Sequence, residues 1–472
     1  MKTPNFRRHR VAAAVAGTLL ALGATQAFAT GFQLNEQSAS SIGNAFAGGA
    51  AFTDDISAMW WNPAVLSKFE RRQFIQGLHV VVPKIEFSND ASVPALNQPL
   101  GGTGGDAGGW NFIPNLYFSM PINDQFAFGL GINGPFGNKT EYSDGWMGRY
   151  QGLLSKIITI NVNPAISWKV TPEFSIGAGV NFQYIDGEFT SNANYSAAMA
   201  SAAGAAAAAG QIPAALVPQI IGATAGLDSN VKITGDDTAW GWNIGAAWDV
   251  TPAVRLAAAY RSEIKYKLGG TADFNNPTIS NVPPQLAPVI ATLANAVNTR
   301  ALYTRSITSD IKLPDIANVS GVWKFDRQWE FMADAQWTGW SNITDLTFVP
   351  TDGSVLPGVP LEWDDTWKFA VGTSYRYNEQ WKARFGVAFD QTPVTTHPTV
   401  RLPDSDRWWI TVGGEYRWTP NWKFDAGLVY IKGDTANFDQ RFSATEAATL
   451  GQLRGSYDAS VWILSAQAAY VF

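Results

Sequence analysis

Apolar and polar residues alternate with a period of two along much of the chain after residue 70. From Phe126 to Asn133, every second residue is apolar, and the residues between them are small or polar. The same pattern runs from Ile158 to Lys169 and from Trp381 to Asp390. Successive side chains of a β-strand point to opposite faces, so this period indicates strands that have one apolar face. The alternation therefore predicts many β-strands.

A short polar phrase, often containing Asn, Asp, Thr or Pro, recurs six times between such alternating stretches. These six predicted turns are residues 122–126, 170–174, 250–254, 325–329, 377–381 and 418–422. Long irregular segments rich in Gly, Ala, Pro and Asn lie between successive turns. A soluble sandwich also alternates, but short turns that alternate with long loops are typical of a barrel in the bacterial outer membrane.

Six turns connect twelve strands, and one more strand at each end brings both chain ends to the side of the short turns. We place the first strand at about residues 72–87 and the last at about residues 456–472. An even number of strands lets the sheet close without an unpaired edge in lipid. The sequence therefore predicts an all-β fold, a 14-stranded antiparallel transmembrane β-barrel over residues 71–472.

Aromatic residues are frequent, and many tryptophans flank the predicted turns. Aromatic rings gather at both membrane–water interfaces of an outer-membrane barrel. Ordinary burial is the alternative, but it does not account for so many tryptophans beside turns. The girdle residues that we predict are Trp168, Trp329, Trp381, Trp408, Trp409, Trp418 and Trp422.

The segment before residue 30 has the three parts of a secretory signal peptide. Four basic residues precede an apolar run at 11–24, and Ala27-Phe28-Ala29 supplies the small residues of a cleavage site. We therefore predict a signal peptide over residues 1–29. Without it, 29 Lys and Arg face 39 Asp and Glu, so nucleic acid is not an expected partner. The chain has no Cys, which excludes disulfides in the exported protein.

Residues 30–70 lack the alternation of the later chain. Their apolar residues lie among Ser, Ala, Gly and Asn, which favours short helical turns and loops. Near the end of this segment, Pro63 fixes φ and restricts Asn62 to extended conformations, giving a rigid corner. We predict a plug, or hatch, inside the barrel; a surface arm is the alternative. The predicted hatch and gating residues are Phe32, Asn62, Pro63 and Ala64.

Two of the long segments, residues 187–231 and 269–305, contain apolar residues at helical spacing. Apolar helices on the aqueous side of a membrane need an apolar surface to cover. They either pack on each other or form a groove for an apolar ligand. The predicted ligand groove consists of Leu216, Val217, Ile220, Ile221, Leu286, Val289, Ile290, Leu293 and Val297.

Glycine and proline interrupt the outer end of the third predicted strand. Proline donates no backbone hydrogen bond and glycine weakens a strand, so a break in the barrel wall would cost least there. A strand end above the membrane is the alternative. The predicted lateral opening consists of Gly131, Gly134, Pro135 and Gly137.

After the signal peptide only His79 and His397 remain, and neither lies in a recognisable metal or nucleophile motif. The acidic groups at residues 54–55 and 404–407 fit catalytic carboxylates or a Ca²⁺ site, but plug or loop charges are the commoner case. We therefore predict no catalytic residue, no metal and no cofactor. A general porin with an open, charged interior and a hydrolase in the barrel wall are the alternatives.

The stretch GFQLNEQSASSIGNAFAGGAAFTDDISAMWWNPA resembles the N-terminal hatch of the FadL-type outer-membrane long-chain fatty acid transporters. Residues 120–126, 260–263 and 402–409 are similar to family stretches in the same order. The resemblance implies a fourteen-stranded barrel, a plug, a low-affinity groove on the outer face and a deeper hydrophobic site. It also implies a kinked third strand that opens sideways.

For function, the resemblance implies passive uptake of hydrophobic molecules, with long-chain fatty acids as the first expectation. The protein would be a monomer surrounded by the lipid of a Gram-negative outer membrane. The basic residues that hold an acidic head group in the family have no clear counterpart here, and the nearest position is about Ser191. A hydrophobic ligand in general is therefore the firmer expectation.

Overall fold

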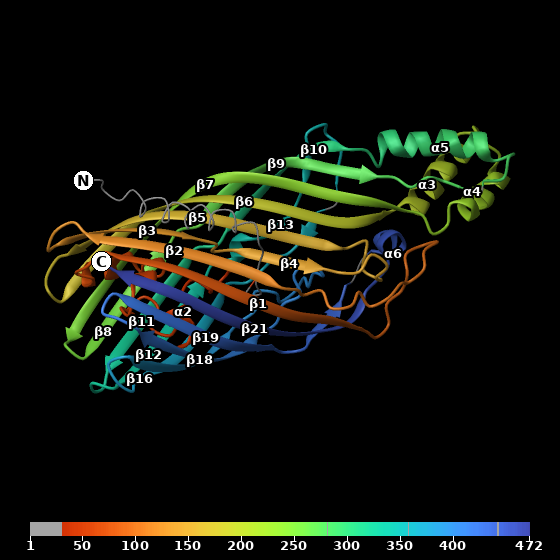
Figure 1. Cartoon of the computed structure of the whole chain (residues 1–472). Coiled ribbons are helices and arrows are strands. Elements are labelled where there is room, and N and C mark those ends of the chain that lie inside the picture. The colour runs from red at the N-terminus through yellow and green to blue at the C-terminus, as the bar shows by residue number, and fades with distance from the viewer. Residues whose placement is uncertain (1–30, 281, 357, 441–442) are drawn as a thin grey trace, which may run out of the picture.

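A closed antiparallel β-sheet forms most of the computed structural model, which describes residues 31–280, 282–356, 358–440 and 443–472 (Figure 1). The predicted signal peptide lies outside the described residues. The first strand, β1 (Gln73–Asn89), pairs with the last, β21 (Arg454–Val471). Their pairing runs from Gln73↔Val471 to Asn89↔Gly455 and closes the barrel.

The barrel has fourteen strands, as the sequence predicted, and several of them carry two labels because they are interrupted. Each of the six predicted turns connects two strands that pair with each other. After β1 the strands are β2 (Asn111–Pro121), β3 (Phe126–Asn133) with β4 (Gly137–Glu141), β5 (Leu154–Lys169), β6 (Phe174–Asn194), β7 (Asp228–Thr251), β8 (Val254–Arg261) with β9 (Ile264–Asn275), β10 (Arg305–Leu313) with β11 (Ile316–Lys324), β12 (Trp329–Thr338) with β14 (Val349–Pro350), β16 (Thr366–Arg376), β17 (Trp381–Asp390), β18 (Arg407–Arg417), β19 (Trp422–Gly433) with β20 (Ala436–Asp439), and β21.

The wall of the barrel is taller on one side than on the other (Figure 1). Strands β6 and β7 have 21 and 24 residues, whereas β12 and β17 have 10 each. Above the short strands, residues 339–356, 358–365 and 391–406 continue the chain on the outer side. The loop that precedes β16 contains η4 (Trp340–Asn342) and a small hairpin of β13 (Asp345–Leu346) and β15 (Val359–Pro360).

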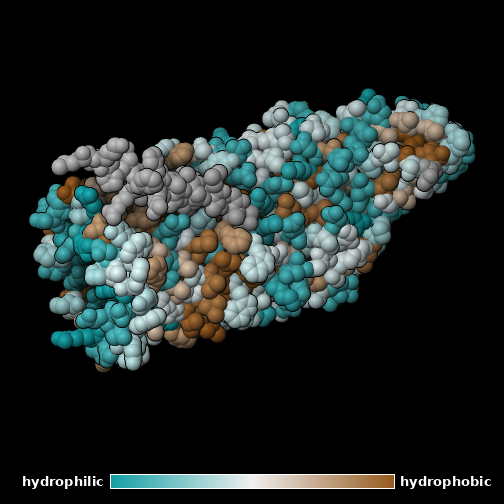
Figure 2. Space-filling view, in the orientation of Figure 1, coloured by the Kyte–Doolittle hydropathy of each residue, from teal (hydrophilic) through white to brown (hydrophobic). Residues whose placement is uncertain are grey.

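The side chains of each strand alternate between the outer surface and the interior. On β17, Phe385 is 47% exposed on the lipid side, whereas Arg384 and Lys382 are buried inside. Figure 2 shows a hydrophobic patch on the side of the barrel, between more hydrophilic ends. The prediction that Trp408 and Trp409 both belong to a girdle is wrong, because neighbouring residues of a strand face opposite ways. Trp408 is 55% exposed, but Trp409 is fully buried.

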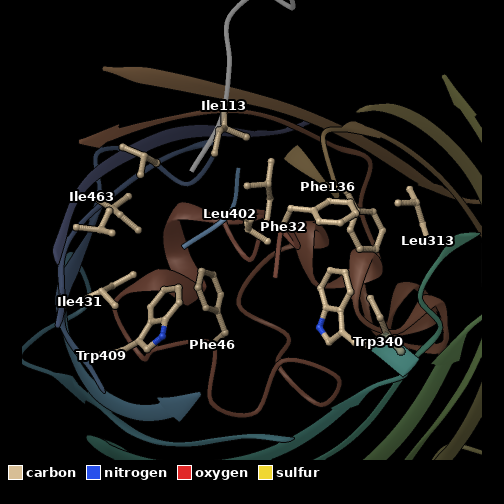
Figure 3. Close-up of a cluster of buried hydrophobic side chains, with 14 of the residues drawn as sticks. Phe32, Phe46, Ile113, Phe136, Leu313, Trp340, Leu402, Trp409, Ile431 and Ile463 are labelled. Carbon is tan, nitrogen blue, oxygen red and sulfur yellow. The ribbon is translucent and has the colours of Figure 1, made fainter. Parts of the chain in front are cut away.

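The plug, residues 31–69, lies inside the barrel and is buried along nearly all of its length (Figure 3). It consists of short helical turns and loops, as predicted. These turns are α2 (Ala39–Ile42), η1 (Ile56–Trp60) and η2 (Pro63–Lys68). Ser38, Asp55 and Asn62 cap them by accepting hydrogen bonds from backbone N–H groups.

Helices cap the tall side of the barrel at its outer end (Figure 1). They are α3 (Tyr195–Ala208), η3 (Ala214–Leu216) with α4 (Val217–Ala223), and α5 (Ala287–Arg300), while α6 (Ala444–Leu450) lies before β21. The first predicted loop, 187–231, is shorter than expected, because β6 and β7 stay paired as far as Asn194↔Asp228. Within the described residues, no helix is long and apolar enough to cross a membrane.

Candidate functional site

A cavity of about 450 Å³ lies between the plug and the loops of the short side of the barrel. Phe32 of the plug, Ile157 of β5, Phe189 of β6 and Ile311 of β10 contribute apolar walls. Pockets that bind small apolar molecules typically have volumes of about 300–1,000 Å³ and a few polar groups. The other lining residues are Asn138, Ser155, 308–310, Lys312, 342–347, Val349, Val359, Leu361, Trp363, Thr399, Arg401 and Leu402.

An aromatic cluster stands at the plug side of this cavity (Figure 3). The ring of Phe32 lies 6.0 Å from Phe136, 5.1 Å from Trp340 and 5.9 Å from Trp363, measured between ring centroids. Phe136 follows the third strand, and the two tryptophans come from the loop above β12. Such edge and tilted contacts each contribute about 0.5–1.5 kcal/mol beyond area burial. Phe32 therefore fixes the start of the plug between the cavity and the third strand.

Arg401 is the cation that the cavity places among apolar walls. Its Nη1 donates to the Leu154 carbonyl at 3.4 Å and to Ser155 Oγ at 3.2 Å, and its guanidinium lies 5.6 Å from the Phe189 ring centroid. Its Nε has no hydrogen-bond partner, and no carboxylate of the described residues forms an ion pair with it. Burial lowers the pKa of Arg401 to about 10, so it stays charged at neutral pH.

Arg401 is not among the residues predicted from the sequence, where the nearest position to the family's basic residues is about Ser191. The available signal was its position directly before Leu402, at the start of the 402–409 family stretch. The Arg401 backbone is held by β4, since Asn138 Nδ2 and Thr140 Oγ1 both donate to its carbonyl at 3.0 Å. A loop residue is thus anchored to the strand that follows the break in the wall.

The third strand is interrupted at two of the four residues predicted for a lateral opening, Gly134 and Pro135, and Gly137 is the first residue after the interruption. β3 ends at Asn133, residues 134–136 leave the sheet, and β4 begins at Gly137. β3 pairs with β2 only as far as Ile132↔Leu116, and β4 pairs with β5. Among the described residues, 111–115 of β2 therefore have no strand partner on this side. Gly131 lies below the break and faces inward, with Tyr117 beside it.

The plug occupies the inner side of this break. Leu34 N–H donates to the Pro135 carbonyl at 2.8 Å, and Gly137 N–H donates to the Phe32 carbonyl at 2.7 Å. Gln37 Nε2 donates to the Gly134 carbonyl, also at 2.8 Å. The N–H and carbonyl of Phe136 are instead bonded to the Thr159 hydroxyl of β5. The plug and β5 thus satisfy backbone groups that the interrupted strand releases, which is how a break in lipid can persist.

The corner of the plug that the sequence singled out is anchored to the barrel wall at β7. Asn62 Nδ2 donates to the Ala50 carbonyl at 2.8 Å and to the Ala246 carbonyl of β7 at 3.0 Å. Pro63 begins η2, and Ala64 N–H donates to Asn62 Oδ1 at 2.9 Å. These contacts fix the plug's lower end, far along the chain from Phe32.

Ion pairs bind the middle of the plug to β17 and β19. Asp54 lies 2.7 Å from Lys382 Nζ and 2.8 Å from Arg384 Nη2, and Asp55 lies 3.2 Å from Lys423 Nζ. Burial alone would raise the pKa of Asp54, but Lys382 and Arg384 outweigh it and hold that pKa well below its usual range. The acidic pair therefore holds the plug and is not a metal site.

Glu36 is a different kind of plug residue, because it is fully buried and no side chain of the described residues donates a hydrogen bond to its carboxylate oxygens. Burial raises its pKa to about 7, although nearby backbone N–H groups and the positive charges of Lys368 and Arg407 act in the opposite direction. The carboxyl group therefore changes its charge near neutral pH.

No catalytic arrangement emerges from the two histidines. His79 is buried beneath the plug, 2.6 Å from Ser465 Oγ at Nδ1 and 2.8 Å from Asn115 Nδ2 at Nε2. Because the amide nitrogen of Asn115 only donates, Nε2 accepts and Nδ1 carries the proton, so His79 cannot take a proton from Ser465. His397 is half-buried beside Glu362. Among the described residues, no group of His, Cys, Asp or Glu could hold a metal ion.

The acidic cluster at 404–407 joins the loop to the plug. Asp404 accepts a hydrogen bond from the Gly31 N–H at 3.1 Å and lies 2.9 Å from Arg407 Nη2. It fixes the plug's first described residue, directly before Phe32.

The predicted groove residues all lie in the outer helices and the turn before α5. Ile220, Leu286, Ile290, Leu293 and Val297 are buried where α3, α4 and α5 pack together. The remaining four, Leu216, Val217, Ile221 and Val289, are half-buried. Figure 2 shows a hydrophobic patch at this outer tip.

Comparison with known proteins agrees with this architecture. Residues 20–472 match the sequence profile of the family described as outer membrane protein transport protein (OMPP1/FadL/TodX). The long-chain fatty acid transport protein of Shigella flexneri is 31% identical over 381 residues, covering 79% of this chain and 81% of the relative. Outer membrane protein P1 of Haemophilus influenzae is 30% identical over 441 residues, covering 90% of each.

Solved structures show the same fold. A Pseudomonas aeruginosa FadL homologue has a TM-score of 0.79 at 27% identity, covering 93% of this chain and 99% of its own. The Ralstonia pickettii toluene transporter TbuX has a TM-score of 0.59 at 21% identity, with 94% and 99% covered, which supports the fold alone. The family consists of outer-membrane transport proteins for hydrophobic compounds, not enzymes. This chain, with its closed fourteen-stranded barrel and its plug, belongs to that OMPP1/FadL/TodX family of the Gram-negative outer membrane.

Proposed function

We propose that this outer-membrane transport protein carries long-chain fatty acids, or closely related amphiphiles, and that the cavity beside Phe32 is their binding site. The observation that carries the proposal is Arg401, a cation that forms no ion pair with the described residues and lies in a cavity with apolar walls. A guanidinium holds a carboxylate through charge-assisted hydrogen bonds. The fatty acid relatives support the same ligand class.

The apolar walls would hold the acyl chain. Burial of apolar surface contributes about 25 cal/mol per Å², so binding needs no energy source or cofactor. The half-buried residues Leu216, Val217, Ile221 and Val289 would make the first apolar contact at the outer tip. Transport is then passive diffusion down a series of binding sites.

Release would occur sideways, through the interrupted third strand. Phe32 borders the cavity on one side and contacts Phe136 of the break on the other. Movement of the plug's first residues would break the Leu34–Pro135 and Gly137–Phe32 hydrogen bonds and open a path into the membrane. The anchors at Asp54, Asp55 and Asn62 would keep the rest of the plug in place, so the ligand would not cross the barrel end to end.

One closed chain supplies the barrel, the plug and the cavity, so we propose a working monomer surrounded by lipid. A general porin is a weaker reading, because the plug fills the interior.

The test of ligand class is Arg401→Leu. Loss of a charge-assisted hydrogen bond of about 1.5–3 kcal/mol should weaken binding of a long-chain carboxylate by roughly 10- to 100-fold. Binding of the uncharged alcohol with the same chain should not change. Equilibrium binding to the purified protein measures both.

Arg327→Leu, in an exposed turn at the other end of the barrel, is the matched control. Equal affinities of wild type and Arg401→Leu for the carboxylate would contradict the head-group assignment.

A further inference from the structure

The barrel wall has a second discontinuity, beside β10. On one side β10 pairs with β9 along its whole length, from Arg305↔Ala272 to Leu313↔Ile264. On the other side it pairs only at Ile307 and Thr308, with β14. The ladder between the two strands resumes at Ile316↔Thr338. Within the described part of the chain, residues 309–314 therefore have no ladder partner on this side, a gap of roughly 20 Å along the strand.

Side-chain hydrogen bonds close only the two ends of this gap. At the outer end, Ser309 Oγ donates to the Thr347 carbonyl at 2.8 Å. At the inner end, Asn342 Nδ2 donates to Asp315 Oδ1 at 3.3 Å. We call the gap between residues 309–314 and 342–347 the seam.

The ligand cavity reaches the seam. A cavity bounded only by inward-facing side chains would touch every second residue of a strand. This cavity is lined by five successive residues of β10, 308–312, and by six successive residues of the facing loop, 342–347. Contact with successive residues means that the cavity extends to the free edge of β10, between the strand and the loop.

The seam lies just above the outer aromatic girdle. Trp337 and Trp367 pair directly across β12 and β16, one residue inside the level where the ladder resumes. Trp367 is 44% exposed, which is typical of a ring at the interface. Residues 309–314 follow on the outer side of that level, so the seam borders the head-group layer of the outer leaflet.

Lys312 stands at the seam with its charge uncompensated. It is exposed, lines the cavity, and has no ion pair or hydrogen bond to its ammonium group among the described residues. Its neighbour across the β9 ladder is a second lysine, Lys265, whose charge is paired with Glu263 at 2.7 Å. Two lysines directly opposite repel each other, and an anion beside Lys312 would relieve that repulsion.

We propose that the seam is a second opening of the ligand cavity, through which anionic amphiphiles pass from the outer-leaflet interface, with Lys312 meeting the acidic head before Arg401 binds it inside. The proposal rests on the proposed function of the cavity. It adds a lateral path for molecules already dissolved in the outer leaflet, separate from the break in the third strand. The seam lies between β10 and the 342–347 loop, whereas the break lies between β2 and β4.

Because the chain has no Cys, a single introduced cysteine can be labelled selectively. The Lys312→Cys variant is folded, inserted into bilayers and then labelled with a bulky maleimide. Lys265→Cys with the same label is the control, because it lies at the same height but one strand away from the seam. A fluorescent long-chain carboxylate, supplied either within vesicle lipid or from water, reports association, dissociation and Kd by stopped flow.

Because Lys312 also lines the cavity, the label can change Kd itself, so the test compares the two sources of probe within each adduct. The association rate from lipid divided by the association rate from water should fall about tenfold in the Lys312 adduct and stay unchanged in the Lys265 adduct. An equal ratio in the two adducts would overturn the proposal.

Arg401→Leu, measured beside the adducts, separates the two proposals. A changed Kd in Arg401→Leu tests the cavity, and a changed ratio of association rates in the Lys312 adduct tests the seam. The unlabelled Cys variants show whether the substitutions themselves affect folding.

Discussion

Replacement of Glu36 by Gln should strengthen the docking of the plug in a way that depends on pH. In the docked plug this carboxyl group is buried, with no side-chain hydrogen-bond partner among the described residues, and its pKa is about 7 instead of 4.5. An acid whose pKa is raised on docking opposes docking when it is ionised. The penalty is absent below pH 4.5, grows between pH 4.5 and 7, and is complete above about pH 7.

The size of the effect follows from the two pKa values. Each pH unit between them corresponds to about 1.36 kcal/mol, so the complete penalty is about 3 kcal/mol. Gln has nearly the same shape and carries no charge. Glu36→Gln should therefore stabilise the docked plug by about 3 kcal/mol at pH 8, roughly a hundredfold in the docking equilibrium, and by nothing at pH 4.

Hydrogen exchange measures this directly. The Asn62 N–H donates to the Ala58 carbonyl at 3.0 Å inside the plug, so its protection reports docking. The ratio of exchange rates between variant and wild type at one pH removes the intrinsic pH dependence of exchange. Glu379→Gln, in an exposed turn, serves as the control. Unchanged protection at pH 8, or an equal gain at pH 4, would refute the reasoning.

Four further predictions concern the plug, the lipid face and the lateral path. Asp54→Asn removes the acid between two buried cations and should destabilise plug docking by about 3–5 kcal/mol. Ion conductance in planar bilayers should then rise. Conductance equal to that of wild type would show that Asp54 does not anchor the plug. Deletion of residues 31–59 should leave a folded barrel that conducts ions better still, and an unchanged current would mean that the segment does not occlude. Phe385→Arg should cost about 2–4 kcal/mol of stability in lipid, because residue 385 faces outward, and equal stability in urea titrations would count against that orientation. Gly134→Val combined with Pro135→Val should reduce uptake of a long-chain fatty acid while leaving its binding unchanged, and full uptake at matched surface expression would exclude the third strand from the path.

The strands could be predicted from the sequence because their signals are local. A period of two marks each strand, and the turn residues between two strands are adjacent in the chain. The girdle prediction failed at Trp409 because it rested on composition, which does not distinguish two adjacent tryptophans. Side chains alternate between the two faces of a strand, so only one of the pair can face lipid. The extension of β6 and β7 was missed because above the membrane the outer face need not be apolar.

The cavity could not be predicted, since its walls come from parts of the chain that only barrel closure brings together. Ile157, Ile311 and Arg401 belong to β5, β10 and a distant loop. Phe32 was identified as a gating residue from its place in the plug, but nothing local to it indicates Trp340 or Trp363 as neighbours. The seam could not be predicted from the sequence either. Whether residues of β10 have a ladder partner depends on the residue at which the facing chain leaves the sheet, and no local pattern marks that residue.

The pairing of the first strand with the last has a consequence for how the protein assembles. The plug precedes β1 in the chain, yet it can be enclosed only when β21 reaches β1. That contact joins the first and the last strand of the barrel, so it has the highest cost of loop closure and forms late. Gln467 of β21 accepts a hydrogen bond from the plug's Ala39 N–H at 3.0 Å and donates to Asp55 at 2.8 Å. The plug thus offers hydrogen-bonding groups to which the final strand can bind. If the barrel closes while the plug is still outside, the plug cannot enter afterwards.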